Sequence, residues 1–194
     1  MSAAERDKWD ARYRDGAYEN RTHPTALLAA WLPRLPRSRA LDVACGAGRN
    51  ALYLAANGFS VTALDISTVG LERGRRAAAA RALEIEWLAA DLDENPRDAL
   101  PAGPFDLIVW VRYVQPTLMP HLLARLCLGG MLLCEQHLQT QAEVAGPASP
   151  AFRLEPGELQ RIAVGLRVLH SYEGFIVDPD GRRVSLTQLI GEMT

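Results

Sequence analysis

A short loop with two glycines holds the first residues in this sequence that could do chemistry. Gly46 and Gly48 lie between an apolar run, residues 39–44, and an Ala/Leu-rich run, residues 49–57, which predict a strand followed by a helix. We call residues 44–48 the glycine loop. Glycine suits such a turn because it adopts positive φ and because a side chain would keep a ligand from the backbone. The pattern is typical of a nucleotide-like ligand, although a tight strand–helix turn alone would also account for it.

Two aspartates follow the next two predicted strands. Asp65 comes directly after residues 59–64, where a carboxylate can accept hydrogen bonds from both hydroxyls of an adenosine ribose. An acid at a helix N-terminus would look the same in the sequence. Asp91 follows residues 84–89, where it either meets an adenine amino group or is an ordinary loop residue. The glycines and both acids together specify a ligand site more strongly than any one of them.

Charge distinguishes two possible ligands for this loop. A dinucleotide needs the loop and the helix N-terminus to hold a pyrophosphate, and GAGRNA fits the GxGxxA pattern. Asp42, just before the loop, would place a negative charge beside that pyrophosphate. S-adenosylmethionine has no phosphate and carries an ammonium and a sulfonium group, which nearby acids tolerate. The sequence therefore favours S-adenosylmethionine over a nicotinamide dinucleotide.

The elements that position these residues alternate along the chain as strand and helix. Near-continuous apolar runs predict strands that are covered on both faces, as in a parallel sheet. Ser67 or Thr68 is expected to cap the second helix, while Gly58 and Gly129–Gly130 are expected to end the first and third. The predicted strands are 39–44, 59–64, 84–89, 105–111 and 130–135, and the predicted helices are 49–57, 67–82 and 117–127.

The pattern changes in the C-terminal third. Residues 139–151 read as a loop and residues 155–163 as a short helix. Residues 165–177 and 182–190 then predict two strands joined by the turn DPDG, which is a hairpin signal. The predicted fold class is α/β: a doubly wound, mostly parallel seven-stranded sheet with an antiparallel C-terminal hairpin and helices on both faces, in one domain, 1–194.

The composition of the chain limits the classes of binding partner that we expect. The 194 residues carry a net charge of −2, which gives no general reason to expect nucleic-acid binding, and Arg73, Arg75 and Arg76 read as a solvated helix face. The charged N-terminus lacks the apolar segment of a secretory signal, and no apolar run reaches the roughly 18 residues of a membrane span. We therefore expect a cytoplasmic protein with no membrane or nucleic-acid partner.

Cysteine and histidine spacing argues against a metal site. The three cysteines are widely separated and embedded in apolar sequence, which is typical of reduced thiols rather than disulfides. The four histidines show no ligand spacing with one another or with the cysteines, so no metal is expected.

The motifs resemble a known family. LDVACGAGRN looks like the first motif of Rossmann-like (class I) S-adenosylmethionine-dependent methyltransferases, and ALDIS, LAADL, FDLIVWV and LGGMLLCE fall where later motifs belong. KWDARYRDGAY is similar to the small-molecule branch with tellurite-resistance-type and thiopurine-type enzymes. The resemblance implies a cofactor-binding core over 39–136, an N-terminal lid over 1–24, and a loop, helix and hairpin over 139–194.

The resemblance also implies a donor site on the strand ends. Backbone of the glycine loop would face the methionyl group, Asp65 the ribose, and Asp91 the adenine. One departure is Ala44 at a usual glycine position, and another is WVRYVQ in place of an Asn- or Asp-Pro-Pro-aromatic motif, which argues against the branch that methylates nucleic-acid bases. The residues expected to bind the donor are Trp9, Asp42, Ala44, Cys45, Gly46, Gly48, Asp65, Ile66, Asp91, Leu92 and Val109.

Candidates for the acceptor side follow the fourth and fifth strands. Methyl transfer is an in-line displacement, and a general base is needed only when the acceptor must lose a proton. Arg112 and Tyr113, after the fourth strand, and Glu135 and His137, after the fifth, are the candidates. Tyr113 could equally be a packing aromatic and His137 a loop residue. We hypothesise that Arg112 binds an anionic acceptor or the carboxylate of the donor.

Three aromatic residues stand out in the charged N-terminal segment. Trp9, Tyr13 and Tyr18 suggest a lid with an aromatic face near the sulfonium, and an amphipathic helix packed on the sheet edge is the alternative. The leading function is methyl transfer to a small-molecule acceptor. A non-catalytic S-adenosylmethionine-binding protein, a nicotinamide-dependent oxidoreductase, and an RNA or protein methyltransferase remain as alternatives. The sequence names neither the acceptor atom nor an oligomeric state.

Overall fold

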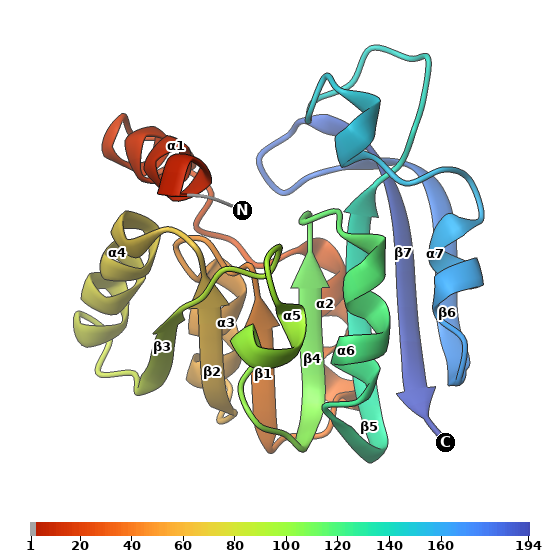
Figure 1. The fold of residues 1–194 in the computed structure, drawn as a ribbon, viewed down its shortest axis with the longest axis horizontal. Coiled ribbons are helices and arrows are strands. Elements are labelled where there is room, and N and C mark those ends of the chain that lie inside the picture. Colours follow the sequence, from red (N-terminus) through yellow and green to blue (C-terminus); the bar gives the residue numbers. More distant parts are fainter. Residues whose placement is uncertain (1–2) are drawn as a thin grey trace.

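Seven strands form one sheet in the order β3-β2-β1-β4-β5-β7-β6, and helices lie on both of its faces (Figure 1). The structure is a computed structural model that describes residues 3–194. Strands β1 to β5 pair in parallel, whereas β7 runs antiparallel to both β5 and β6. The strands are β1 (Arg39–Val43), β2 (Ser60–Asp65), β3 (Ile85–Ala89), β4 (Phe105–Val111), β5 (Leu126–His137), β6 (Leu166–Val177) and β7 (Arg183–Met193).

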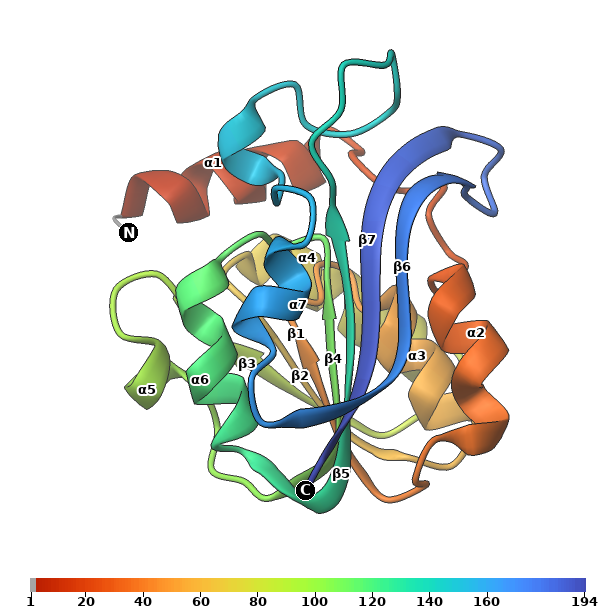
Figure 2. The same ribbon diagram turned by 90° about the vertical axis from the view of Figure 1, so that its right-hand side faces the viewer.

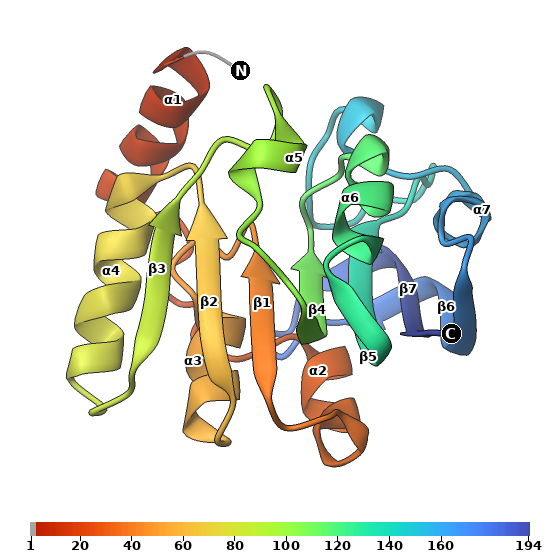
Figure 3. The ribbon, with the colours of Figure 1, turned by 60° about the horizontal axis from the view of Figure 1, so that its bottom comes forward.

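The helices divide between the two faces (Figures 2 and 3). On one face α2, α3 and α4 bury Leu28, Leu54 and Leu71, and on the other α6 and α7 bury Leu122 and Leu159. The α-helices are α1 (Ala3–Arg14), α2 (Ala26–Trp31), α3 (Arg49–Ala56), α4 (Thr68–Ala79), α5 (Pro96–Ala99), α6 (Met119–Leu123) and α7 (Glu158–Ile162), and the 3₁₀ turns are η1 (Leu32–Arg34), η2 (Pro116–Leu118) and η3 (Pro150–Phe152). None of the helices within residues 3–194 is long and apolar enough to span a membrane.

The predicted fold class is confirmed, since all seven predicted strands form the expected mixed sheet. Ser67 caps α4 by accepting a 3.0 Å hydrogen bond from the amide of Gly70. Gly58 follows α3 with a φ of +86°, as expected of a residue just past a helix end. These local signals depend on neighbours in the sequence, which explains why they could be predicted.

The third predicted helix, 117–127, is wrong at its C-terminal end. Helix α6 stops at Leu123, and the chain enters β5 at Leu126, which pairs with Phe105 of β4. Gly129–Gly130 therefore lies inside β5 rather than before it. A β-carbon at Gly130 would lie 2.9 Å from the carbonyl oxygen of Cys127 and 3.0 Å from that of Phe105, so the close approach of these two backbone groups explains this glycine.

Two short helices and one arginine contact are not predicted by the sequence pattern. Helix α2 is the six-residue apolar run ALLAAW and α5 is the four-residue run PRDA, so both are too short to show a helical period. Arg73, expected on a solvated face, donates a 3.0 Å hydrogen bond from Nη1 to the carbonyl oxygen of Ala17. Helix α1 packs across α4, at the end of the sheet where the parallel strands finish (Figure 3). The N-terminal segment therefore lies at the edge where the predicted site residues gather.

Candidate functional site

The glycine loop makes the turn between β1 and α3. Ala44, Gly46 and Gly48 all have positive φ, at 52°, 60° and 75°. The amide of Gly48 donates to the carbonyl oxygen of Cys45 at 2.9 Å, and the amide of Cys45 donates to that of Leu64 at 2.9 Å. An alanine at positive φ is uncommon, because its β-carbon disfavours that region. The loop is thus held by the adjacent strand as well as by its own turn.

Asp65, at the end of β2, contacts the glycine loop directly. Its Oδ2 accepts a 2.7 Å hydrogen bond from the amide of Gly46, and its Oδ1 accepts a 2.8 Å bond from the amide of Ser67. Burial raises the pKa of Asp65, and the two amides oppose that rise. A carboxylate offers about four lone-pair positions. The amide of Ile66 also lies against this carboxylate, so part of its accepting capacity remains for the ribose hydroxyls expected here.

Asp42 has a structural contact that its place in the sequence did not reveal. It is 1% exposed, and its Oδ2 accepts a 2.9 Å hydrogen bond from the amide of Ala51 in the first turn of α3. Burial raises the pKa of this carboxyl to about 7. Asp42 therefore joins β1 to α3 across the glycine loop.

Tyr13, rather than Trp9, is the aromatic residue of α1 that contacts the glycine loop. A β-carbon at Gly46 would lie 2.3 Å from the Tyr13 hydroxyl oxygen, and one at Gly70 would lie 3.0 Å from its Cε2. Tyr13 is buried, whereas Trp9 is half-buried with the Arg12 guanidinium 4.9 Å from its ring centroid. Gly46 is therefore required for the approach of α1 as well as for its own φ.

Asp10 joins α1 to the start of α4 through hydrogen bonds. Its carboxylate accepts hydrogen bonds from Ser67 Oγ at 2.6 Å, Thr68 Oγ1 at 3.1 Å and the Val69 amide at 3.2 Å. Ser67 also donates its amide to Asp65, so one residue joins α1 to the expected ribose site. No local pattern indicates this contact, because it depends on residues that are far apart in the chain.

Gly48 meets a ring that sequence reasoning did not connect with it. β-carbons at Gly48 and Gly74 would lie 2.4 and 2.5 Å from Cη2 of Trp87, which comes from β3. The absence of a side chain at Gly48 therefore lets Trp87 pack between α3 and α4, in addition to permitting the turn.

The loops after β3 and β4 are joined by a small polar network. Asp91 Oδ1 accepts a 2.9 Å hydrogen bond from the amide of Asp93. Oδ1 of Asp93 accepts hydrogen bonds from the Tyr113 hydroxyl and, at 3.0 Å, from Gln115 Nε2. Burial and the contact with Asp93 raise the pKa of Tyr113. Tyr113 therefore stays protonated at neutral pH and connects the acceptor side to the expected adenine edge.

The apolar residues expected around the donor lie at different depths. Ile66 and Cys45 are half-buried, whereas Leu92 and Val109 are 5% and 0% exposed. Val109 packs wholly in the core beneath α2 and α3, and Leu92 packs in the core of the other face. Of these four residues, Ile66 and Cys45 are the ones that are not fully buried.

Arg112 forms ion pairs with two carboxylates inside the protein. Its Nη1 and Nη2 donate to the two carboxylate oxygens of Asp178 at 2.7 and 2.6 Å. Its Nε and Nη2 donate to Glu135 Oε1 at 3.1 and 3.0 Å. Burial lowers the pKa of Arg112, and these carboxylates raise it by more. Arg112 thus ties the ends of β4 and β5 to the turn between β6 and β7, which leaves little of it for an external anion.

His137, at the end of β5, is buried beneath the loop 139–151. It is 8% exposed, its Nδ1 has no hydrogen-bond partner within residues 3–194, and a β-carbon at Gly146 would lie 2.8 Å from its Cε1. Burial and the neighbouring Arg112 and Arg153 lower the pKa of His137 to about 3. Its imidazole is therefore neutral at physiological pH.

The described part of the chain holds no metal cluster: no three His, Cys, Asp or Glu side chains in residues 3–194 are placed to share an ion. Cys45, Cys127 and Cys134 are free thiols, as expected.

Residues 40–127 match the family model described as a methyltransferase domain. The S-adenosyl-L-methionine-dependent Diels–Alderase iccD of Talaromyces variabilis is 35% identical over 80 residues, which cover 41% of this chain and 27% of that protein. The ubiquinone biosynthesis O-methyltransferase of Caulobacter sp. (strain K31) is 33% identical over 89 residues, 46% of this chain and 34% of that enzyme. The chain thus spans about a third of the length of these relatives. Among solved structures, TehB from Haemophilus influenzae has a TM-score of 0.73 at 20% identity, covering 87% of this chain and 61% of that one.

The sheet order and the likeness to TehB show the α/β fold of class I methyltransferases. Residues 40–127 are therefore similar to methyltransferase domains, among them those of S-adenosylmethionine-dependent enzymes.

Proposed function

We propose that this protein transfers the methyl group of S-adenosylmethionine to a small-molecule acceptor in the cytoplasm. The observation that carries the proposal is the 2.7 Å hydrogen bond between the Gly46 amide and Asp65 Oδ2, which brings the glycine loop to the acid that ends β2. The remaining hydrogen-bonding capacity of that carboxylate suits the hydroxyls of a ribose. The match to a methyltransferase domain supports a methyl donor as the ligand. The free thiols support a reducing compartment.

The bound donor would supply an electrophilic methyl carbon. The acceptor would form a bond to that carbon as the carbon–sulfur bond breaks, and S-adenosylhomocysteine would leave as a thioether. The residues of this chain would bind and orient the donor and exclude water from it. Asp65 would hold the ribose and Asp91 the adenine, and Tyr13 would cover the glycine loop. Positioning is thus the main contribution of the protein.

Of the candidates expected on the acceptor side, neither His137 nor Tyr113 is poised as a strong base. His137 is neutral with a pKa of about 3, and the pKa of the Tyr113 hydroxyl is raised above its usual value. We infer that the acceptor reacts as a soft or already ionised nucleophile, whose proton, if it has one, passes to water. His137 then serves as a neutral hydrogen-bonding group, Tyr113 positions the loop after β3, and Arg112 positions the turn after β6.

A second candidate is an S-adenosylmethionine-dependent reaction in which no methyl group moves. The similarity to a Diels–Alderase that depends on S-adenosylmethionine favours it. Methyl-labelled donor separates the two, since methyl transfer places label in a new product and releases S-adenosylhomocysteine. Conversion of an acceptor without loss of label from the donor would support the second candidate.

The proposal is tested first by calorimetric titration with S-adenosylhomocysteine, with NADH as the comparison. We expect micromolar binding of S-adenosylhomocysteine alone. Asp65→Asn should weaken it by at least about tenfold, since a ribose hydroxyl loses a charged acceptor. Asp7→Asn on the exposed side of α1 is the control. Binding of NADH instead, or of neither ligand, would contradict the assignment.

A further inference from the structure

Two nitrogen atoms without hydrogen-bond partners approach each other beneath the loop that follows β5. His137 is 8% exposed, and its Nδ1 makes no hydrogen bond within residues 3–194. A β-carbon at Gly146 would lie 2.9 Å from this Nδ1 and 3.3 Å from Nη2 of Arg153. We call His137, Gly146 and Arg153 the loop site. Its two nitrogens therefore converge on one point beside the main chain at Gly146.

Arg153 is a cation that is held in place by neutral groups. Its Nε donates to the carbonyl oxygen of Pro147 and its Nη1 to that of Leu138, each at 2.9 Å. Within the described part of the chain, Nη2 makes no hydrogen bond and the guanidinium makes no ion pair. Because the guanidinium is planar, the two bonds to the main chain also fix the direction of Nη2. Nη2 is therefore a preorganised donor with a full positive charge behind it.

The charges around His137 are mostly positive. Burial lowers the pKa of His137, three arginines lower it further and one carboxylate raises it: Arg112, Arg153 and Arg21 against Asp178. A neutral imidazole carries one N–H, which either ring nitrogen can hold. An oxygen beside Nδ1 would therefore accept one hydrogen bond from a neutral ring and one from a guanidinium. An anionic oxygen gains most from this pair of donors, since the surrounding charge is positive.

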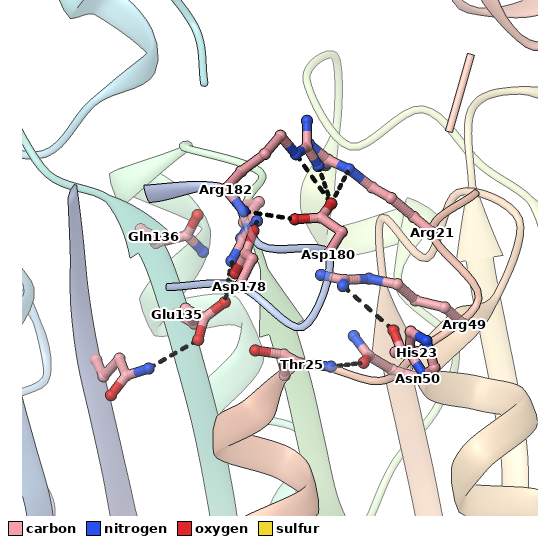
Figure 4. Close-up of polar contacts among 12 residues, drawn as sticks. Arg21, His23, Thr25, Arg49, Asn50, Glu135, Gln136, Asp178, Asp180 and Arg182 are labelled. Carbon is pink, nitrogen blue, oxygen red and sulfur yellow. Dashed lines mark hydrogen bonds and ion pairs between the residues drawn. The ribbon is translucent and has the colours of Figure 1, made fainter. Parts of the chain in front are cut away.

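Figure 4 shows a neighbouring carboxylate paired with other arginines. Asp180 lies between Arg182, whose Nε is 2.9 Å away, and Arg21, whose Nε is 3.8 Å away. Asp178 accepts hydrogen bonds of 2.7 and 2.6 Å from Arg112. These carboxylates therefore do not balance the charge of Arg153, which an anion beside Nη2 would do.

The cover over the loop site is one residue thick. Gly146 is exposed to solvent, although His137 beneath it is buried. Its φ of +128° is a conformation that residues with a side chain rarely adopt, and glycine also leaves no β-carbon over the ring. A small outward shift of the main chain at Gly146 would therefore expose Nδ1 and Nη2 to a ligand.

We propose that His137 and Arg153 together bind an anionic oxygen of the methyl acceptor. The acceptor is then a small molecule that carries a carboxylate or another oxyanion group in addition to the atom that is methylated. The inference rests on the proposed function, since it assumes that the acceptor lies beyond the end of β5. Arg153 takes the role first considered for Arg112, whose guanidinium is occupied by Glu135 and Asp178.

The test uses three probes that separate charge from the acceptor atom. 3-Mercaptopropionate carries a carboxylate and a thiol, its methyl ester keeps the thiol without the charge, and inorganic phosphate is an anion without a thiol. Each is titrated into the protein with and without S-adenosylhomocysteine, and the side-chain ¹⁵N resonances of His137 are followed by NMR. We expect both anions to shift these resonances saturably toward the tautomer with the proton on Nδ1. The ester should leave them unchanged.

Variants show whether the loop site itself binds the probes. Arg153→Met should weaken both anions by at least about fivefold, and Arg153→Lys, which keeps the charge, should recover part of the loss. Gly146→Ala should also weaken them, since its β-carbon would lie 2.8 Å from Cε1 of His137. Gly165→Ala is the matched control, because Gly165 has a φ of +96° and its new β-carbon would have no neighbouring atom within 4 Å. Thermal unfolding of each variant shows whether it remains folded.

Three outcomes would overturn the proposal. Equal shifts with the ester, or no shift with either anion, would mean that the loop site does not recognise negative charge. Binding of phosphate without binding of 3-mercaptopropionate would mean that a free anion, rather than an acceptor, is the ligand. Equal weakening in folded Gly165→Ala would mean that the anions bind elsewhere. The probes are observed without methyl transfer, so failure to bind S-adenosylhomocysteine would count against the proposed function and is distinguishable from these outcomes.

Discussion

Asp178, just past the end of β6, holds Arg112, just past the end of β4, through two parallel hydrogen bonds of 2.6 and 2.7 Å. Both side chains are less than 10% exposed, and Glu135 shares the same guanidinium. A bidentate pair of this kind fixes orientation as well as distance. The turn between β6 and β7 is therefore held against the carboxyl edge of the parallel strands.

Removal of Arg112 should destabilise the protein strongly. Arg112→Met leaves Glu135 and Asp178 with uncompensated buried charge, and the expected loss is about 3–5 kcal/mol of unfolding free energy in urea. The pair with Arg112 holds the pKa of Asp178 below its usual value, although burial raises it. Because the folded pKa is depressed, this contribution is present above the unfolded pKa and is lost as the pH falls. Arg112→Met with Asp178→Asn should recover part of the loss, and an unchanged urea midpoint in the single variant would contradict the prediction.

Asp42 should make the free energy of unfolding depend on pH in the opposite direction. Its folded pKa of about 7 lies above the unfolded value, so the unfolded state ionises first as the pH rises. Between about pH 4 and pH 7 the free energy of unfolding should fall by up to about 1.4 kcal/mol per pH unit from this group. Asp42→Asn, which keeps an acceptor for the Ala51 amide, should remove that slope. Identical slopes for both proteins would rule the prediction out.

Gly46→Ala should disrupt the contact between the glycine loop and α1. The new β-carbon would lie 2.3 Å from the Tyr13 hydroxyl oxygen, so α1 must shift, and positive φ adds strain. We expect a stability loss of more than about 1 kcal/mol and weaker binding of S-adenosylhomocysteine. Gly58→Ala is the matched control, since Gly58 has φ of +86° and its new β-carbon would have no neighbouring atom within 4 Å. Tyr13→Phe should partly rescue Gly46→Ala but not Gly58→Ala.

Asp10→Ala should release α1 from α4 without unfolding the sheet. Three hydrogen bonds, to Ser67, Thr68 and Val69, are lost. Amide hydrogen exchange should accelerate over residues 3–14, and S-adenosylhomocysteine should bind about fivefold more weakly if α1 covers the donor. Asp7→Ala on the same helix is exposed and serves as the control. Faster exchange with unchanged affinity would show that α1 is an ordinary packed helix rather than a lid.

The sequence was most informative where one segment determines its own structure. The strand that ends at Asp65, the cap at Ser67 and the turn at Gly48 are local features, and each was predicted. The ion pair of Arg112 with Asp178 joins residues that are distant in the chain, so no local pattern could indicate it. For the same reason the sequence could not show that Tyr13 rather than Trp9 contacts the glycine loop, since that depends on how α1 lies across α4.

The two antiparallel strands at the end of the chain have a consequence for how acceptor preference can change. The turn between them contacts the N-terminal segment through the ion pair of Asp180 with Arg21. The surface beyond β4 is therefore formed by residues from the N-terminal and the C-terminal parts of the sequence. The match to the methyltransferase family, by contrast, covers residues 40–127. Under the proposed function, we expect substitutions in this surface to alter acceptor preference while the strands proposed to hold the donor stay unchanged.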